Sequence, residues 1–396
     1  MSAFAGVFYF DRRPMDPKIR EALDAYLHSF GPDGAGAWTE DGLVLVHRAL
    51  HVTPEDGQEL QPIVSSSGCV LTWDGRLDNR DDLLLQFHHE LRECPADAVL
   101  ALKALERWGI EGVSRLVGDW SLAFWQAPER RLWLASDYLG TRPLYYRAAA
   151  DHLAWSSSLG ELVLREGVRE DLDDVFILGY LANFVPAGYT PYRPVRSVVP
   201  AHAVGFGSDG ACTNRRFYDY RINTIRLRSD ADYEELLREV FAKAVAARLR
   251  STQPVWLDLS GGLDSSSVVC MADWLLKRGH VDPIGLRSFS FFSGGSPEDD
   301  DRRFITAVEQ QCGCRGEHVD EDSTFTLIDE TDGWVTPYHP NGARLWQLRH
   351  IRQQGGRVLL TGKGGDLPPC CDLGLESLRS RAPSSLAPDR VHRGGP

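Results

Sequence analysis

Residues 259–266, with the sequence LSGGLDSS, constrain the fold more than any other segment. An apolar run at 254–259 precedes them and favours a buried strand, and residues 268–276 follow with the apolar face of a helix. A strand, a turn rich in glycine and serine and then a helix is a layout that binds phosphate. Glycine lets backbone N–H groups approach an anion, and the helix N-terminus adds partial positive charge. Asp264 fits such a loop if it holds a Mg²⁺ that shares the phosphates.

Two other phosphate-binding loops are excluded by the same residues. The Gly-Lys-Ser/Thr ending of a Walker loop is absent, and so is the Gly-x-Gly-x-x-Gly spacing of a dinucleotide fingerprint. The segment instead resembles the pyrophosphate-binding loop of ATP pyrophosphatases, Ser-Gly-Gly-x-Asp-Ser. Those enzymes split ATP between the α and β phosphates and adenylate a substrate.

Length and charge bound the remaining possibilities. A chain of 396 residues predicts two domains. The net charge of −13 argues against nucleic acid as the main partner, because a phosphate backbone requires a basic face. No apolar run is long enough to span a membrane, and the N-terminus lacks the basic start of a signal peptide. The eight cysteines show no zinc spacing, so we expect free thiols in a reducing cytoplasm.

The two halves of the chain differ in their expected elements. Residues 1–205 are dense in short strands with two main helices, at 81–89 and 97–108, which indicates sheet layers covered by helices. A polar connection follows at 206–228. In residues 229–366 strands and helices alternate, which predicts a parallel α/β sheet.

Six segments in one order resemble the asparagine synthetase family. The resemblance implies an N-terminal Ntn-type αββα sandwich of the glutaminase kind, followed by a truncated, Rossmann-like α/β ATP pyrophosphatase domain. It covers residues 1 to about 366. The segments that carry it are Gly31–Gly34, Trp73–Arg80, Gly118–Trp125, Asp137–Tyr146, the phosphate loop and Leu359–Asp366.

Within that family, two shorter pieces resemble the divergent bacterial branch that includes lasso-peptide cyclases and is similar to β-lactam synthetase. They are His51–Glu55 and Asp78–Arg80. This branch closes rings with an amine that the substrate itself carries.

The residues at the glutamine site depart from the family pattern. A glutaminase of this family starts Met-Cys-Gly and uses that cysteine as nucleophile, whereas this chain has Ser2, a weaker nucleophile at neutral pH. Ala49 stands where the family arginine grips the glutamine carboxylate. The family Asn-Gly-Glu has become Asp74-Gly75-Arg76, which loses an oxyanion-hole amide and reverses a charge. Asp97 alone is left as a ligand for the glutamine amine, so we expect no glutamine hydrolysis.

The resemblance also assigns an ATP site. Asp264 and Asp366 would hold Mg²⁺, and Gly362 would lie under the nucleotide. Lys363 stands where the family often has Glu or Tyr; it either acts on phosphate or the acyl-adenylate, or is an exposed charge. The residues expected to bind ATP and its pyrophosphate are Leu259, Ser260, Gly261, Gly262, Asp264, Ser265, Ser266 and Gly362.

Past Asp366 the family pattern stops. Residues 367–396 are rich in Arg, Ser and Pro without apolar periodicity, so we expect a disordered or aberrant tail, from a frameshift, a fragment or a true short variant.

The implied reaction is ATP-dependent amide formation on a small-molecule or peptide carboxylate. Aspartate to asparagine is the family default. A lasso-peptide or β-lactam type of ring closure and a non-catalytic remnant or scaffold are the alternatives, and a homodimer is possible in each.

Overall fold

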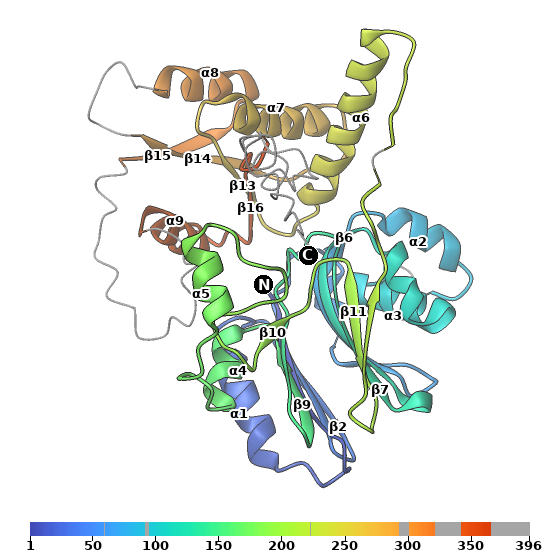
Figure 1. Ribbon diagram of the computed structural model, residues 1–396. Helices are drawn as coiled ribbons and strands as arrows, with labels where there is room; N and C mark the ends of the chain where they lie inside the picture. The colour runs from blue at the N-terminus through green and yellow to red at the C-terminus, as the bar shows by residue number, and fades with distance from the viewer. Residues whose placement is uncertain (59, 92–94, 222, 293–300, 321–341, 366–396) are drawn as a thin grey trace, which may run out of the picture.

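The chain is described by a computed structural model at residues 1–58, 60–91, 95–221, 223–292, 301–320 and 342–365. An antiparallel sandwich is built from the first half of the chain, and a parallel sheet with helices from the second (Figure 1). The N-terminus lies at the junction of the two parts. The expected fold, an αββα sandwich followed by a parallel α/β domain, is therefore confirmed.

The sandwich consists of two antiparallel sheets. In the described residues each has six strands, and the first has the order β10-β8-β9-β1-β3-β2, the second β12-β11-β7-β6-β5-β4. The strands of the first sheet are β1 (Ala3–Tyr9), β2 (Gly34–Glu40), β3 (Leu43–Ala49), β8 (Tyr145–Ala148), β9 (His152–Ser156) and β10 (Arg196–Ser197). Those of the second are β4 (Ile63–Val64), β5 (Val70–Leu77), β6 (Gly118–Gln126), β7 (Arg131–Ser136), β11 (His202–Phe206) and β12 (Cys212–Arg216).

Strand alternation builds two cores on the second sheet. In β6, Trp125 faces the first sheet with Phe4 of β1, whereas Trp120 and Phe124 face outward into a second apolar cluster. Successive side chains of a strand point to opposite faces, so one sequence serves both cores. The helices on this outer side are α2 (Arg80–Phe87) and α3 (Asp97–Trp108), and those on the outer side of the first sheet include α1 (Pro17–Leu27) and α4 (Leu159–Arg165).

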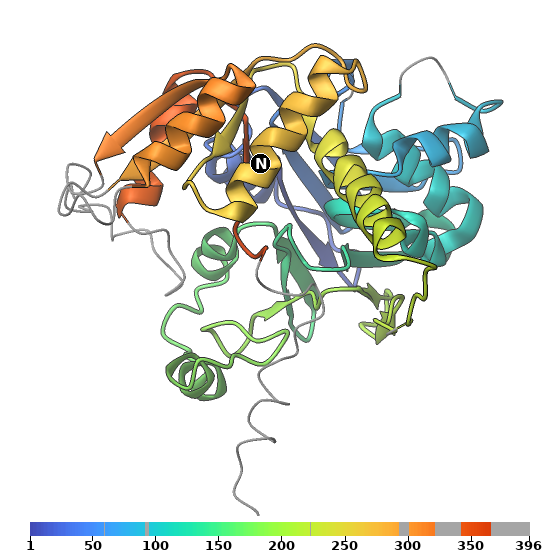
Figure 2. The ribbon, with the colours of Figure 1, turned by 90° about the horizontal axis from the view of Figure 1, so that it is seen from above.

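The second half contains a parallel sheet in the order β15-β14-β13-β16. On one face, α6, α7 and α8 lie side by side (Figure 2), and on the other Ile351 of α9 packs against Trp256 and Phe289. Crossover helices on both faces are the usual cover of a parallel sheet. The elements are α6 (Asp230–Leu249), β13 (Val255–Asp258), α7 (Leu263–Lys277), β14 (Leu286–Phe292), α8 (Arg302–Cys312), β15 (Arg315–Asp320), α9 (Gly342–Gln353) and β16 (Val358–Leu360).

Some elements lie where the sequence did not indicate them. β12 adds an edge strand to the second sheet from residues that the sequence analysis places in the connection, and its sequence, CTNRR, shows no apolar face. The short helix α5 (Asp174–Leu181) has apolar residues on every side. Its sequence therefore shows no helical repeat of apolar and polar residues. The expected tail at 367–396 lies outside the described residues. Among the helices that the structure describes, none combines the length and apolarity needed to cross a membrane.

Candidate functional site

The predicted phosphate loop connects β13 to α7. Gly261 has φ +82°, the left-handed region that favours glycine, and a Cβ there would come within 3.1 Å of the Asp301 carbonyl oxygen. Ser260 donates its backbone N–H to Ser265 Oγ at 3.2 Å, and the Ser265 hydroxyl donates to the Gly262 carbonyl at 3.2 Å. These bonds hold the turn in one shape before any ligand binds.

No side chain caps the first turn of α7. Gly262, the N-cap, has no side chain to accept a hydrogen bond from the N–H groups of this turn. Asp264 and Ser266 lie half-buried in this turn, Ser265 is buried, and Leu259 anchors the loop in the core beneath it. The predicted phosphate-binding residues of this segment therefore share one helix N-terminus, where backbone donors and the helix dipole favour negative charge.

The turn after β16 presses against this loop. A Cβ on Gly362 would lie 2.5 Å from the Ser265 backbone nitrogen, and one on Gly365 would lie 2.4 Å from Cγ of Asp264. Only glycines allow the two segments, about a hundred residues apart in sequence, to approach so closely. Lys363 is exposed, and its N–H donates to the Thr361 hydroxyl at 3.1 Å.

Only one of the two carboxylates predicted to hold Mg²⁺ lies in the described residues. Asp264 packs against Gly365 of the turn after β16, whereas Asp366 lies outside the described residues. Within those residues no three His, Cys, Asp or Glu side chains are grouped to hold a metal ion.

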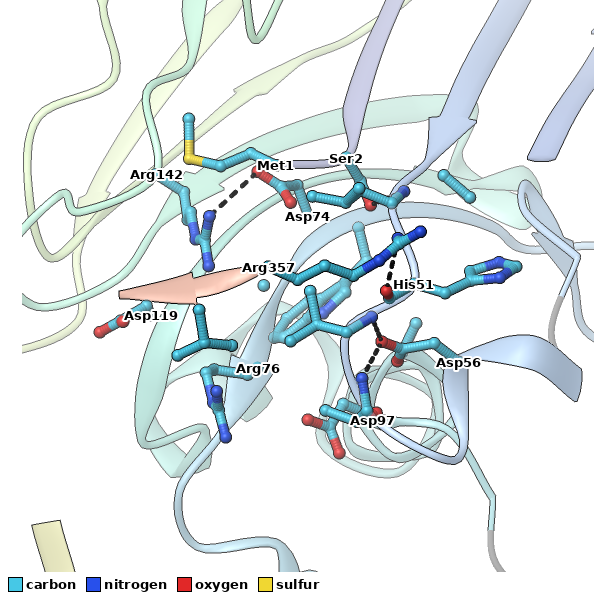
Figure 3. A pocket seen from close by; sticks show the side chains of 18 of the residues that line it. Met1, Ser2, His51, Asp56, Asp74, Arg76, Asp97, Asp119, Arg142 and Arg357 are labelled. Atoms are coloured by element: carbon cyan, nitrogen blue, oxygen red, sulfur yellow. Dashed lines mark hydrogen bonds and ion pairs between the residues drawn. The ribbon is translucent and has the colours of Figure 1, made fainter. Parts of the chain in front are cut away.

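A cavity of about 250 Å³ opens between the sandwich and β16 (Figure 3). Val358, Leu359 and Leu360 of β16 form one wall of it. β16 leads to the glycine turn that packs on the phosphate loop. The same strand thus also borders the cavity at the N-terminus. All the predicted remnants of the glutamine pocket line the cavity, namely Ser2, Ala49, Asp74, Gly75, Arg76 and Asp97.

The N-terminus and Asp74 face one another in this cavity. Burial lowers the pKa of the Met1 amino group and raises that of the Asp74 carboxyl. Arg142 lies on the same side, with Nη1 4.0 Å from Asp74 Oδ2. The Ser2 hydroxyl accepts a hydrogen bond from the Leu50 N–H at 2.9 Å. Gly75 is required here, because a Cβ would lie 2.4 Å from the Asp119 carbonyl oxygen.

Arg76 contacts the second domain. Its guanidinium donates to the carbonyl of Ala247, near the C-terminal end of α6, and to the carbonyl of Arg250 at 3.4 Å. The carbonyls of a helix end lack partners within the helix, so they accept readily from a cation. Burial, with Arg250 and Arg248 nearby, lowers the pKa of Arg76 to about 10.

Asp97, the first residue of α3, has both carboxylate oxygens engaged. Oδ1 accepts from Arg80 at 2.8 Å, and Oδ2 accepts from the Leu77 N–H at 2.8 Å and from Arg250 of the second domain. The buried carboxylate therefore forms one cluster with the buried Arg80 and the half-buried Arg250. An amine ligand would have to displace one of them.

Both halves of the chain match families of known proteins. Residues 1–218 match the glutamine amidotransferase domain, and residues 236–368 match the asparagine synthase domain. The chain belongs to the asparagine synthetase family. The lasso-peptide branch within it stays a prediction.

The relatives of this family member are distant and longer. Asparagine synthetase 3 of Bacillus subtilis is 26% identical, in a match that covers 68% of this chain and 44% of the relative. Amidase chry2 of Gibberella zeae is 24% identical over 90% of this chain and 55% of its own length. Asparagine synthetase of Zea mays is 24% identical, with 87% and 55% covered. The chain thus spans about half the length of these relatives.

Among solved structures, the chain matches glutamine phosphoribosylpyrophosphate amidotransferase from B. subtilis, complexed with ADP and GMP. It has a TM-score of 0.39 and 13% identity, and the match covers 91% of this chain and 90% of that one.

Sequence reasoning missed the contacts that join the two domains. Arg248 pairs with Asp78 at 2.9 Å and with Asp119 at 2.8 Å, and Arg357 donates to the His51 carbonyl at 2.8 Å. Asp78 and Asp119 lie inside segments that carry the family resemblance, which marked the segments but gave these residues no role. Nothing in one sequence pairs them with arginines more than a hundred residues away.

Proposed function

We propose that this chain is an ATP-dependent carbon–nitrogen ligase that adenylates a carboxylate and does not hydrolyse glutamine. The observation that carries the proposal is the close packing of the turn after β16 on the first turn of α7, at Gly362 and Gly365. Two glycine turns and a helix N-terminus meet there, and such groups favour the binding of phosphate.

In the proposed reaction a carboxylate oxygen of the substrate attacks the α-phosphorus of ATP and pyrophosphate leaves. An amine then attacks the acyl carbon, and AMP leaves with the electron pair of the broken C–O bond. The N–H groups at the start of α7 and the Ser260 hydroxyl would bind the pyrophosphate oxygens, while Ser265 holds the turn through its bonds to Ser260 and Gly262. Asp264, together with Asp366, would hold a Mg²⁺ that neutralises the phosphates. Lys363 is exposed in the turn after β16, and its charge would stabilise an oxyanion of the phosphates or the acyl-adenylate.

The contacts at the N-terminal cavity support a reaction without glutamine hydrolysis. Arg76 is bound to the end of α6 and Asp97 to two arginines, so neither is free for a glutamine ligand. The Ser2 hydroxyl already accepts from Leu50. Without ammonia from glutamine, the amine comes from solution or from the substrate itself.

Ring closure within one substrate, as in lasso-peptide or β-lactam formation, is the second candidate. It is favoured by the same engaged cavity, because an intramolecular amine needs no ammonia. A scaffold without turnover is the third. We retain aspartate as the family's default substrate, a small-molecule or peptide carboxylate as the partner, a possible homodimer and a cytoplasmic location as parts of the proposal.

The test is ATP–pyrophosphate exchange by purified protein with Mg²⁺ and either aspartate or a candidate precursor peptide. We expect exchange in the wild type, less than a hundredth of it in Asp264→Ala and near wild-type exchange in Asp273→Ala, which removes a carboxylate farther along α7. The substrate that stimulates exchange separates the first two candidates. A folded wild type without exchange on any carboxylate supports the scaffold.

The second measurement is glutamate release from glutamine. We expect none. Release by the wild type that disappears in Ser2→Ala would overturn the absence of glutamine hydrolysis while leaving the ligase proposal intact.

A further inference from the structure

Two cysteines lie side by side on α7 and α8, the neighbouring helices that follow and border the phosphate loop. Cys270 is two turns into α7, and Cys312 is the last residue of α8; their sulfur atoms are 3.9 Å apart. The helices pack side by side on the same face of the parallel sheet (Figure 2). Cys270 is exposed to solvent, whereas Cys312 is buried in the apolar cluster beneath.

Neither packing nor a metal accounts for this arrangement. Two cysteines that serve only to pack the core would both be buried, because free cysteine is among the most buried residue types. Here Cys270 is exposed to solvent. Cys314 lies two residues beyond Cys312, yet among the described residues no three metal-ligating side chains are grouped. The remaining chemistry of two adjacent thiols, one of them accessible, is thiol–disulfide exchange.

We propose that Cys270 and Cys312 are a reversible disulfide pair that links α7 to α8 under oxidising conditions. The oxidant is a small disulfide such as oxidised glutathione. The Cys270 thiolate attacks one of its sulfurs, forming a mixed disulfide and releasing one glutathione. The Cys312 sulfur then attacks Cys270 Sγ and the second glutathione leaves, taking up the Cys312 proton. Two thiols lose two electrons and one disulfide gains them, so the exchange balances.

Burial and exposure set the order of these steps. Burial, with Cys270 and Asp273 of α7 and Cys314 nearby, raises the pKa of Cys312 to about 12, so its thiol is protonated at neutral pH. Cys270 is the exposed member of the pair and reacts first, and Cys312 resolves the mixed disulfide at close range. Closure accelerates with rising pH, because a larger fraction of Cys312 is thiolate.

The bond would join the two helices that border the phosphate loop. Gly261 lies against the start of α8. A Cβ added to it would be 3.1 Å from the Asp301 carbonyl oxygen and 3.3 Å from Cβ of Phe304. Linking Cys270 to Cys312 would restrain α8 against α7, and with it the wall of the loop. The proposal concerns the thiols alone and does not depend on the ligase activity.

The experiment treats the reduced full-length chain with oxidised glutathione at pH 8.5 and at pH 7, followed by tryptic digestion without reductant and mass spectrometry. Trypsin leaves Cys270 in peptide 251–277, and Cys312 and Cys314 together in peptide 304–315. We expect one cross-link between these peptides that dithiothreitol removes and that forms faster at pH 8.5. Cys314→Ser keeps the cross-link, whereas Cys312→Ser stops at glutathionylated Cys270.

A stability measurement gives a second readout. The closed bond should raise the thermal midpoint of the wild type and of Cys314→Ser by roughly 5 °C, with no change in Cys312→Ser. A cross-link that survives in Cys312→Ser, a bond between Cys312 and Cys314 or with any other cysteine, or glutathionylation of the wild type without closure would each overturn the proposal.

Discussion

Arg357 and Asp33 form the ion pair that connects the strand beside the phosphate site to the sandwich. Nη2 of Arg357 is 3.0 Å from Asp33 Oδ1, and Nη1 donates to the other carboxylate oxygen. Arg357 immediately precedes β16, and Asp33 immediately precedes β2. A paired guanidinium and carboxylate hold both partners in one plane, so the pair fixes where β16 meets the N-terminal cavity.

A double-mutant cycle of Asp33→Ala and Arg357→Ala should give a coupling energy of about 1–2 kcal/mol in urea unfolding, because two charge-assisted hydrogen bonds are lost together. The hydrogen bond from Arg357 also lowers the pKa of Asp33. A carboxyl group with a lowered pKa stabilises the folded state at any pH above its pKa in the unfolded chain, which is about 4. This stabilisation is lost as the pH falls below that value. The coupling should therefore weaken as the pH falls below about 4. Additive single variants at pH 7 would show that the pair does not hold the domains.

Replacing Gly261 by alanine should destabilise the second domain by about 1–2 kcal/mol, the cost of a left-handed backbone for a residue with a Cβ. Gly262→Ala is the matched control, because φ there is −74° and a Cβ would meet only the Ser260 hydroxyl, at 3.5 Å. It should cost less than about 0.5 kcal/mol. Urea unfolding of both variants measures the difference. Equal losses would mean that the turn does not depend on the positive φ of Gly261.

Acid should destabilise the sandwich through His47. The ring is 3% exposed, contacts the Trp73 carbonyl at 3.2 Å and has a pKa lowered by burial to about 4. A lowered histidine pKa contributes stability that is fully present above pH 6.5, the pKa of the unfolded state. This stability is lost between pH 6.5 and 4, because only the unfolded state takes up the proton in that range. From pH 7 to 5 this amounts to about 2 kcal/mol.

The measurement compares the pH dependence of the unfolding free energy in the wild type and in His47→Gln, whose amide still donates to Trp73. The variant should lose about 2 kcal/mol less between pH 7 and 5. His28→Gln, at an exposed position, is the matched control for the substitution itself. An unchanged slope in His47→Gln would show that another group carries the acid sensitivity.

The sequence predicted the elements whose signal is local. The sequence predicts the helix at 97–108, which the structure has as α3, and the loop at 259–266 from its glycines and serines. β12 was missed because a polar edge strand needs only one neighbour, so it shows no alternation. The domain contact was missed for a different reason. Arg76 was interpreted as a lost glutamine ligand, and only the fold shows that its guanidinium reaches the end of α6.

Restoring the missing nucleophile should not restore glutamine hydrolysis. Ser2→Cys supplies a thiol, but Ala49 offers no cation for the glutamine carboxylate, and Asp97 is held by Arg80 and Arg250. Glutamine would bind only by displacing a buried arginine, which costs about 3–5 kcal/mol. We expect glutamate release by Ser2→Cys to stay at the level of Ser2→Ala, and Ser2→Ala to lose about 1 kcal/mol of stability with the acceptor for the Leu50 N–H. Release that is saturable in glutamine and specific to the cysteine variant would show that the cavity still recognises glutamine and that position 2 alone silences it.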